Sequence, residues 1–209
     1  MNKKALNIIG QIRIYTLIEL VLFAYAIGSN LQEIAGIVFL HISFLFYLEA
    51  THKHSYRVPI QKYIWIIIGV IGIFLYAKMT VVGFIFASML YVRKKHVPFS
   101  YLSPLSRGFQ NYFLAAGIVG FLSPLAFLVL GVLAVRNFAG DLRDITRDST
   151  ERMKTLPVIL GITRDYKTVH ILSLFVTTFI WWHIAGIPIF WLIAMWAIQI
   201  ATYNITPRK

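Results

Sequence analysis

The apolar residues of this chain come in runs of about the length of a membrane span, and short charged segments separate the runs. A transmembrane helix needs roughly 17–25 mostly apolar residues. This pattern favours an all-α fold, a polytopic membrane bundle of about eight transmembrane helices. The eight predicted helices lie near residues 12–29, 32–50, 60–77, 79–92, 109–122, 125–140, 168–184 and 187–203.

The positions of the positive charges support this partition, because cytoplasmic loops of membrane proteins are rich in Lys and Arg. If the N-terminus is cytoplasmic, the inner segments hold 19 of the 20 Lys and Arg residues, and Lys78 falls on the outer side. We therefore expect a multi-pass protein with both termini and the long loop after the sixth helix in the cytoplasm. The inner segments are 1–13, 51–62, 93–108, 136–167 and 204–209.

Composition excludes several classes of protein. The chain is 58% hydrophobic and 13% charged, whereas soluble domains are about 45–50% apolar and about 25% charged. The absence of cysteine excludes disulfides, thiol nucleophiles and thiolate metal sites. The net charge of +12 is spread between the apolar runs, so we expect a lipid bilayer and no nucleic acid as partner. No linker divides the chain, which predicts one integral-membrane domain over residues 1–209.

Half of the eight acidic residues fall within residues 141–151, directly after the sixth predicted helix. If the helix continues, Asn137, Asp141, Asp144 and Asp148 share one face, at i, i+4, i+7 and i+11. Carboxylates on one face repel one another, and a divalent cation would relieve the repulsion. Mg²⁺ binds a few carboxylate oxygens together with water and phosphate oxygens, so this stripe predicts a magnesium site.

The same segment has a structural interpretation. An amphipathic helix at the membrane surface would also carry acidic residues, with neighbouring arginines forming solvated salt bridges to them. The arginines that could do so are Arg136, Arg143, Arg147 and Arg152.

The aspartates are followed by Lys154-Thr155-Leu156-Pro157 and Gly161. The combined pattern resembles the second aspartate-rich motif of the UbiA-type intramembrane prenyltransferase superfamily, which lies on the cytoplasmic side between the sixth and seventh helices. The resemblance implies a UbiA-like helical bundle and Mg²⁺ as cofactor. It further implies a diphosphate-binding role for Asn137. The residues that it implies as catalytic are Asp141, Asp144, Asp148 and Lys154, and the three aspartates are also the implied metal ligands.

Two further segments resemble family features that contact the diphosphate. One is Tyr91 with the basic residues Lys94 and Lys95, followed by Arg107 in the same predicted inner loop. The other is Arg13, near the start of the first helix. Without the resemblance, the basic residues after Tyr91 would be explained by the positive-inside rule alone.

The first aspartate-rich motif of the family is altered in this chain. If Glu49 takes the place of its first aspartate, the next two positions hold His52 and Tyr56, and Arg57 echoes a basic residue that follows the family motif. Glu49 and His52 are then further candidate metal ligands, although imidazole suits Mg²⁺ poorly. Alternatively, His52 and Arg57 face lipid headgroups. The chain also has one helix fewer than the nine usual in the family.

The resemblance implies an enzyme, a prenyltransferase that joins a polyprenyl diphosphate donor to an aromatic or lipid acceptor with loss of pyrophosphate. The altered first motif leaves a second hypothesis open, a catalytically inactive homologue that binds an isoprenoid lipid or serves as a partner subunit. A small transporter is disfavoured, because Glu19 is the one ionisable residue deep in a predicted span.

Overall fold

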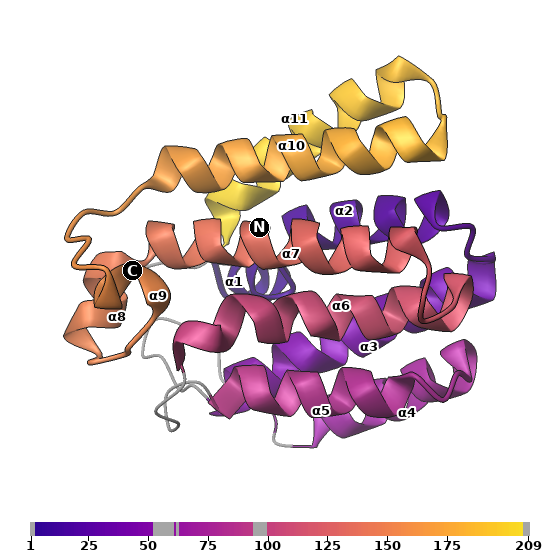
Figure 1. Cartoon of the computed structure of the whole chain (residues 1–209), viewed down its shortest axis with the longest axis horizontal. Helices are drawn as coiled ribbons and strands as arrows, with labels where there is room; N and C mark the ends of the chain where they lie inside the picture. The colour runs from indigo at the N-terminus through magenta and orange to yellow at the C-terminus, as the bar shows by residue number, and fades with distance from the viewer. Residues whose placement is uncertain (1–2, 52–60, 62, 94–99, 207–209) are drawn as a thin grey trace. The chain divides into compact units, whose positions relative to one another are not determined.

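The computed structural model describes residues 3–51, 61, 63–93 and 100–206, with backbone alone for residues 3–6. Within these residues every regular element is a helix, so the predicted all-α class is confirmed (Figure 1). The elements are α1 (Lys3–Gln11), α2 (Ile14–Ala26), α3 (Leu31–Thr51), α4 (Ile64–Tyr76), α5 (Val81–Val92), the 3₁₀ turn η2 (Ser100–Leu102), α6 (Ser103–Val119), α7 (Pro124–Arg143), α8 (Ile145–Thr150), α9 (Leu156–Ile159), α10 (Lys167–Ala185) and α11 (Ile189–Ile205).

Each of the eight predicted spans overlaps one helix, in the order α2, α3, α4, α5, α6, α7, α10 and α11. Three of them, α3, α7 and α10, are long and apolar enough to cross a membrane. Four others, α2, α4, α5 and α11, are apolar but shorter. The remaining helix, α6, carries Arg107, Gln110 and Asn111 along its length. The structure thus supports a membrane protein, and the number of eight spans stays a prediction.

The chain divides into two compact units, Met1–Ala77 with Thr178–Lys209, and Lys78–Thr177. The division falls within α10, so this helix contributes to both. The prediction of one domain over residues 1–209 stays a prediction, and each unit is described by itself below.

In the first unit, glycines bring α3 and α4 into close contact. A Cβ atom on Gly36 would lie 2.6 Å from the backbone nitrogen of Tyr76, and one on Gly72 would lie 2.8 Å from that of Leu40. Aromatic contacts hold α2 against the C-terminal helices: the Tyr15 and Tyr203 rings meet edge to face at 5.2 Å, and Phe23 lies 5.5 Å from Trp181.

The second unit is built on α5, α6 and α7, which run side by side (Figure 1). Gly108 allows α6 to approach α7, because a Cβ there would lie 2.6 Å from the carbonyl oxygen of Leu130. The turn between these helices contains Gly120 at φ 91°, a value that side chains disfavour. The two helices therefore lie close together over the stretch that leads to the acidic segment.

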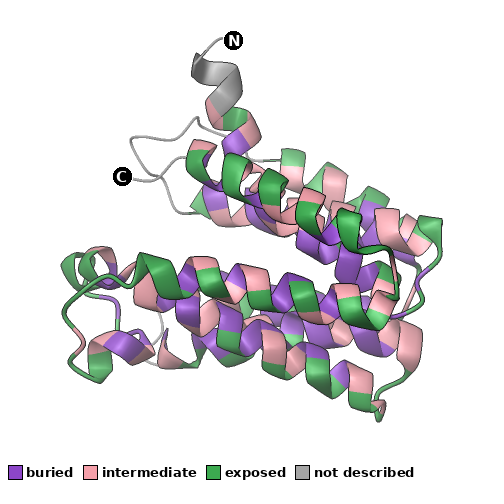
Figure 2. Cartoon of the chain, turned by 90° about the horizontal axis from the view of Figure 1, so that it is seen from above, coloured by how far each residue is buried: buried purple, intermediate pink, exposed green. Residues whose placement is uncertain are grey.

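Large apolar side chains are exposed along the helices of both units (Figure 2). Phe74 on α4 is 77% exposed, and Leu172 on α10 is 59% exposed. Soluble monomers rarely expose contiguous apolar surface on this scale. These exposed apolar side chains fit the surface of a membrane protein.

Candidate functional site

The acidic segment lies where α7 ends and α8 begins. The predicted uninterrupted helix is wrong at Asp144, whose backbone (φ −109°, ψ 17°) separates the two helices. The turn tightens here, because the amide of Asp144 donates to the carbonyl of Asp141 three residues back. The chain downstream holds this geometry, since the Asp165 carboxylate accepts from the amide of Thr146 at 2.8 Å.

Two arginines neutralise Asp144 and Asp148. Arg143 donates to Asp144 through Nε at 2.8 Å and through Nη2 at 2.5 Å. Arg147 donates through one nitrogen, Nη2, to Asp144 Oδ2 at 3.0 Å and to Asp148 Oδ1 at 3.1 Å. The pairing of these arginines with the acidic residues, which the structural interpretation predicted, is confirmed.

The network is only partly solvated. The side chain of Asp148 is 0% exposed, that of Asp144 is 18% exposed and that of Arg147 is 35% exposed. Burial alone would lower the pKa of the Arg147 guanidinium, but the carboxylates of Asp144 and Asp148 outweigh it and raise the pKa above its ordinary value. Arg147 is therefore a permanent cation.

Asp141 makes a separate contact. It is 4% exposed and accepts a hydrogen bond from Ser103 Oγ, at the start of α6, at 2.9 Å. One turn earlier on α7, Asn137 Oδ1 accepts from the Tyr91 hydroxyl of α5 at 3.0 Å. Asn137 and Asp141 thus contact α5 and α6, whereas Asp144 and Asp148 pair with arginines of their own segment.

The three aspartates do not form one ligand group in this arrangement. Across the described part of the chain, no three His, Asp or Glu side chains come together in a cluster that could hold a metal ion. The donor chemistry nevertheless fits a divalent cation, because carboxylate oxygens are the ligands that Mg²⁺ prefers. Arg147 would have to yield Asp144 and Asp148 to such an ion.

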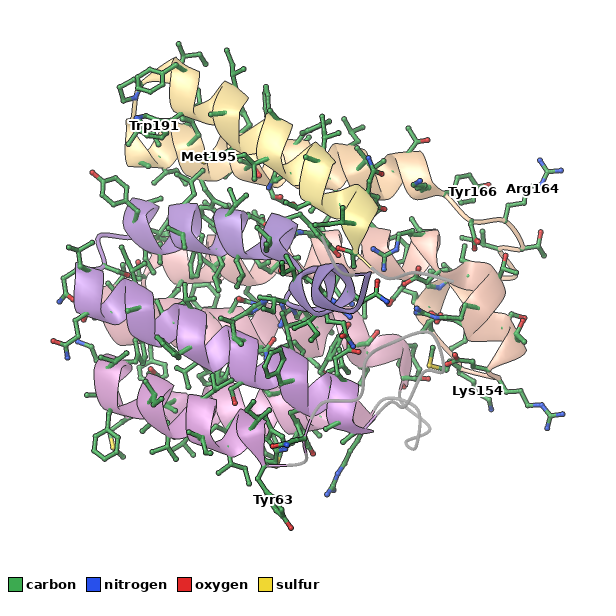
Figure 3. All side chains as sticks on the ribbon, turned by 180° about the vertical axis from the view of Figure 1, so that it is seen from behind. Tyr63, Lys154, Arg164, Tyr166, Trp191 and Met195 are labelled. Carbon is green, nitrogen blue, oxygen red and sulfur yellow. The ribbon has the colours of Figure 1, made fainter. Side chains whose placement is uncertain are left out.

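The segment that follows α8 contacts the acidic residues through its backbone. The amide of Met153 donates to the carbonyl of Asp148 at 2.8 Å. Lys154 is exposed and its side chain projects outward (Figure 3). Thr155, at the start of α9, is 0% exposed, and its hydroxyl has no hydrogen-bond partner among the described residues.

Arg107 is held on its own helix. It donates to the side chain of Gln110, one turn on, and Gln110 in turn donates to Ser88 Oγ at 2.5 Å. Gln110 is fully buried, so this relay fixes the guanidinium near the start of α6. Sequence reasoning did not find Ser88, Ser103 or Gln110, because isolated polar residues in apolar helices show no pattern that separates structural from ligand-binding roles. It named Thr155 as part of the motif after the aspartates but gave it no role.

Arg13 and Glu49 contact each other in the first unit. Arg13 Nη2 lies 3.6 Å from Glu49 Oε1, and the Glu49 side chain is 5% exposed. Arg13 takes a left-handed conformation (φ 54°) between α1 and α2, so the first predicted span begins after a break. The candidate ligand His52 and the basic residues Arg57, Lys94 and Lys95 lie outside the described residues.

Comparison of the chain with protein-family models, with curated proteins and with solved structures yields no match.

Proposed function

We propose that the chain is a membrane prenyltransferase that joins a polyprenyl diphosphate donor to an aromatic or lipid acceptor. The observation that carries the proposal is the cluster of Asp144, Arg147 and Asp148 at the end of an apolar helix, with Lys154 following it. Carboxylates for a cation and basic groups for an anion are what a metal-bound diphosphate requires. The resemblance of this segment to the second aspartate-rich motif of UbiA-type prenyltransferases supports the same function.

The reaction exchanges one bond for another. The bond between the allylic carbon and the diphosphate oxygen breaks, and its electron pair leaves with the diphosphate. The allylic carbon then bonds to the acceptor, which gives up a proton. Negative charge therefore develops on the leaving group while positive charge develops on the allylic carbon, and groups positioned for this distribution lower the barrier.

Residues of the second unit have distinct roles in this proposal. Asp141, Asp144 and Asp148 would hold Mg²⁺, which when bound supplies positive charge to the departing diphosphate. Lys154 and Arg107 would bind the diphosphate oxygens directly, together with Lys94 and Lys95. Tyr91 keeps the Asn137 side chain oriented through its hydroxyl, so that the amide nitrogen of Asn137 remains available to an oxygen of the donor.

The diphosphate-binding role that the resemblance implies for Arg13, in the first unit, stays a prediction. Arg13 is 24% exposed at its side chain while it pairs with Glu49, so it retains a surface for an anionic group. The exposed apolar faces of the helices fit a donor whose long hydrocarbon tail lies in the bilayer.

The test is pyrophosphate release by the purified chain in lipid nanodiscs. Geranylgeranyl diphosphate, Mg²⁺ and a panel of aromatic and glycerol-phosphate acceptors are supplied, and prenylated products are identified by mass spectrometry. We expect turnover in the wild type and its loss in Asp144→Asn. Glu33→Gln is the matched control: it also removes a carboxylate, but Gln can still bond the amide of Asn30, which Glu33 caps. Full activity of Asp144→Asn would contradict the assigned role.

A second candidate function, binding of an isoprenoid lipid or of a partner subunit without catalysis, is favoured by a specific observation. Glu49, the remaining acidic residue of the altered first motif, already pairs with Arg13. Saturable binding of geranylgeranyl diphosphate without product from any acceptor would support this candidate over the enzyme.

A further inference from the structure

Arg147 contacts two of the three carboxylates that the proposed function assigns to the metal. Its Nη2 donates to both Asp144 and Asp148, whereas its Nε is buried and has no acceptor among the described residues. The guanidinium thus contacts one oxygen of each carboxylate while one of its own donors stays unused. An unused buried donor is costly, and an oxyanion would satisfy it.

Thr155 provides an independent sign of a ligand. Its side chain is 0% exposed, and among the residues that the structure describes its hydroxyl has no hydrogen-bond partner. The chain lies against the acidic segment just before it, because the amide of Met153 donates to the carbonyl of Asp148, and α9 packs on α8. Thr155 Oγ1, directly before α9, and Arg147 Nε, on α8, are therefore two buried donors without acceptors in the described part of the chain.

Electrostatics makes either ligand alone a poor occupant. A divalent cation that takes Asp144 and Asp148 displaces Arg147 from both carboxylates and Arg143 from Asp144, and leaves a permanent cation, Arg147, beside it without these two counter-ions. A diphosphate that takes Arg147 leaves Asp144 with Arg143 but removes the Arg147 ion pair from Asp148, beside an anion. When both ligands bind, each positive group faces a negative group, and neither penalty arises.

We propose that Arg147 is an internal counter-ion that couples the binding of the two ligands. It releases Asp144 and Asp148 to a divalent cation when a diphosphate group is present to accept its guanidinium and the Thr155 hydroxyl. The inference rests on the proposed diphosphate site, and it adds that cation and diphosphate bind cooperatively, with Arg147 as the residue that links them.

Binding of Mn²⁺ to the full chain in nanodiscs tests the coupling, because free Mn²⁺ is measured directly by electron paramagnetic resonance. Inorganic pyrophosphate is the second ligand, and the same titration with protein-free nanodiscs corrects for the complex of Mn²⁺ with pyrophosphate in solution. We expect pyrophosphate to tighten Mn²⁺ binding by about tenfold or more, within the range of about 5–150-fold seen for coupled sites. Mn²⁺ should tighten pyrophosphate binding by the same factor.

Arg147→Gln isolates the residue. Without the guanidinium of Arg147, the metal displaces only Arg143 from Asp144 and has one cation fewer to compete with, so Mn²⁺ alone should bind about tenfold more tightly than in the wild type, and pyrophosphate should add less than about twofold. Arg164→Gln is the control that matches the loss of charge, because Arg164 is exposed and projects away from the chain (Figure 3). This control should keep the wild-type coupling.

Thr155 gives a second test that does not disturb the ion pairs. Thr155→Val keeps the shape and removes the hydroxyl, whereas Thr155→Ser keeps the hydroxyl. Pyrophosphate binding in the presence of Mn²⁺ should weaken about fivefold or more in the valine variant and stay unchanged in the serine variant. Binding of Mn²⁺ alone should be unchanged in both.

Equal Mn²⁺ affinity with and without pyrophosphate would overturn the inference, and so would an Arg147→Gln variant with wild-type Mn²⁺ affinity and coupling. These results are distinct from failure of the proposed function. The measurements need no acceptor and no turnover, so coupled binding without prenyl transfer would leave the inference standing. Prenyl transfer together with uncoupled binding would overturn the inference on Arg147, while the proposed enzymatic function would stand.

Discussion

Arg13 and Glu49 form an ion pair between the break that precedes α2 and the last turn of α3, with 3.6 Å between Nη2 and Oε1. The resemblance predicted different partners for them, a diphosphate for Arg13 and a metal ion for Glu49. Their contact joins the N-terminal helices of the first unit at the level of the altered motif.

Replacing Arg13 and replacing Glu49 should lower the free energy of unfolding by different amounts. Glu49 is 5% exposed at its side chain and Arg13 is 24% exposed. Arg13→Met leaves a buried carboxylate without this partner, and we expect a loss of about 1–3 kcal/mol in the free energy of unfolding. Glu49→Gln leaves a guanidinium that reaches water and should cost less. Urea unfolding in detergent, followed by tryptophan fluorescence, measures both, and an equal cost would contradict the burial argument.

The same pair predicts the metal requirement of the altered motif. Because Glu49 is engaged by Arg13, we expect one metal on the side of Asp144 and no ligand role for Glu49 or His52. The Mg²⁺ concentration at half-maximal activity should therefore be unchanged in Glu49→Ala/His52→Ala. A sharp rise in that concentration, with activity falling below about pH 6.5 when the histidine is intact, would instead assign both residues to a metal.

Close packing of α3 on α4 yields a prediction on stability. A methyl group at Gly36 would meet backbone atoms of Tyr76 at 2.6 Å, and backbone cannot move aside as a side chain can. Gly36→Ala should therefore lower the free energy of unfolding by about 1–3 kcal/mol. Gly131→Ala on α7 is the matched control, since its Cβ meets nothing within 4 Å, and it should be neutral or stabilise by up to about 1 kcal/mol. Thermal unfolding in the same detergent compares them.

The helices could be predicted from the sequence because each depends on local information, namely an apolar run between charged or glycine-containing segments. The contacts of the acidic segment could be predicted only in part. Helical spacing accounts for the pair of Asp144 and Arg147, three residues apart. It does not account for the pairs between sequence neighbours, Arg143 with Asp144 and Arg147 with Asp148. It did not predict the interruption at Asp144, which depends on a cap from Asp165 further along the chain.

Contacts between distant segments required the structure. Ser103 lies 38 residues before its partner Asp141, and Arg13 lies far from Glu49 in the chain. Sequence spacing contains no signal for such pairs, because they depend on how the helices pack. For the same reason the sequence predicted a common stripe for the aspartates and not the division of their contacts between Ser103 and the arginines.

The ion pairs of Arg147 should not depend on pH across the range in which the protein can be studied. The pKa of Arg147 is raised above its ordinary value, so its contribution to stability is complete below the ordinary pKa of an arginine and is lost only above the raised pKa. The difference in melting temperature between wild type and Arg147→Gln should therefore be constant from about pH 7 to about pH 10.

In Arg147→Lys the ordinary pKa of the replacement is about 10.4, and the carboxylates raise it further. The lysine variant should accordingly match the wild type in its pH dependence up to about pH 10 and lose stability relative to it above that value. Differential scanning fluorimetry from about pH 7 to about pH 11 measures both differences, and a wild-type advantage over Arg147→Gln that declines between about pH 7 and about pH 9 would contradict the assignment of Arg147 as a permanent cation.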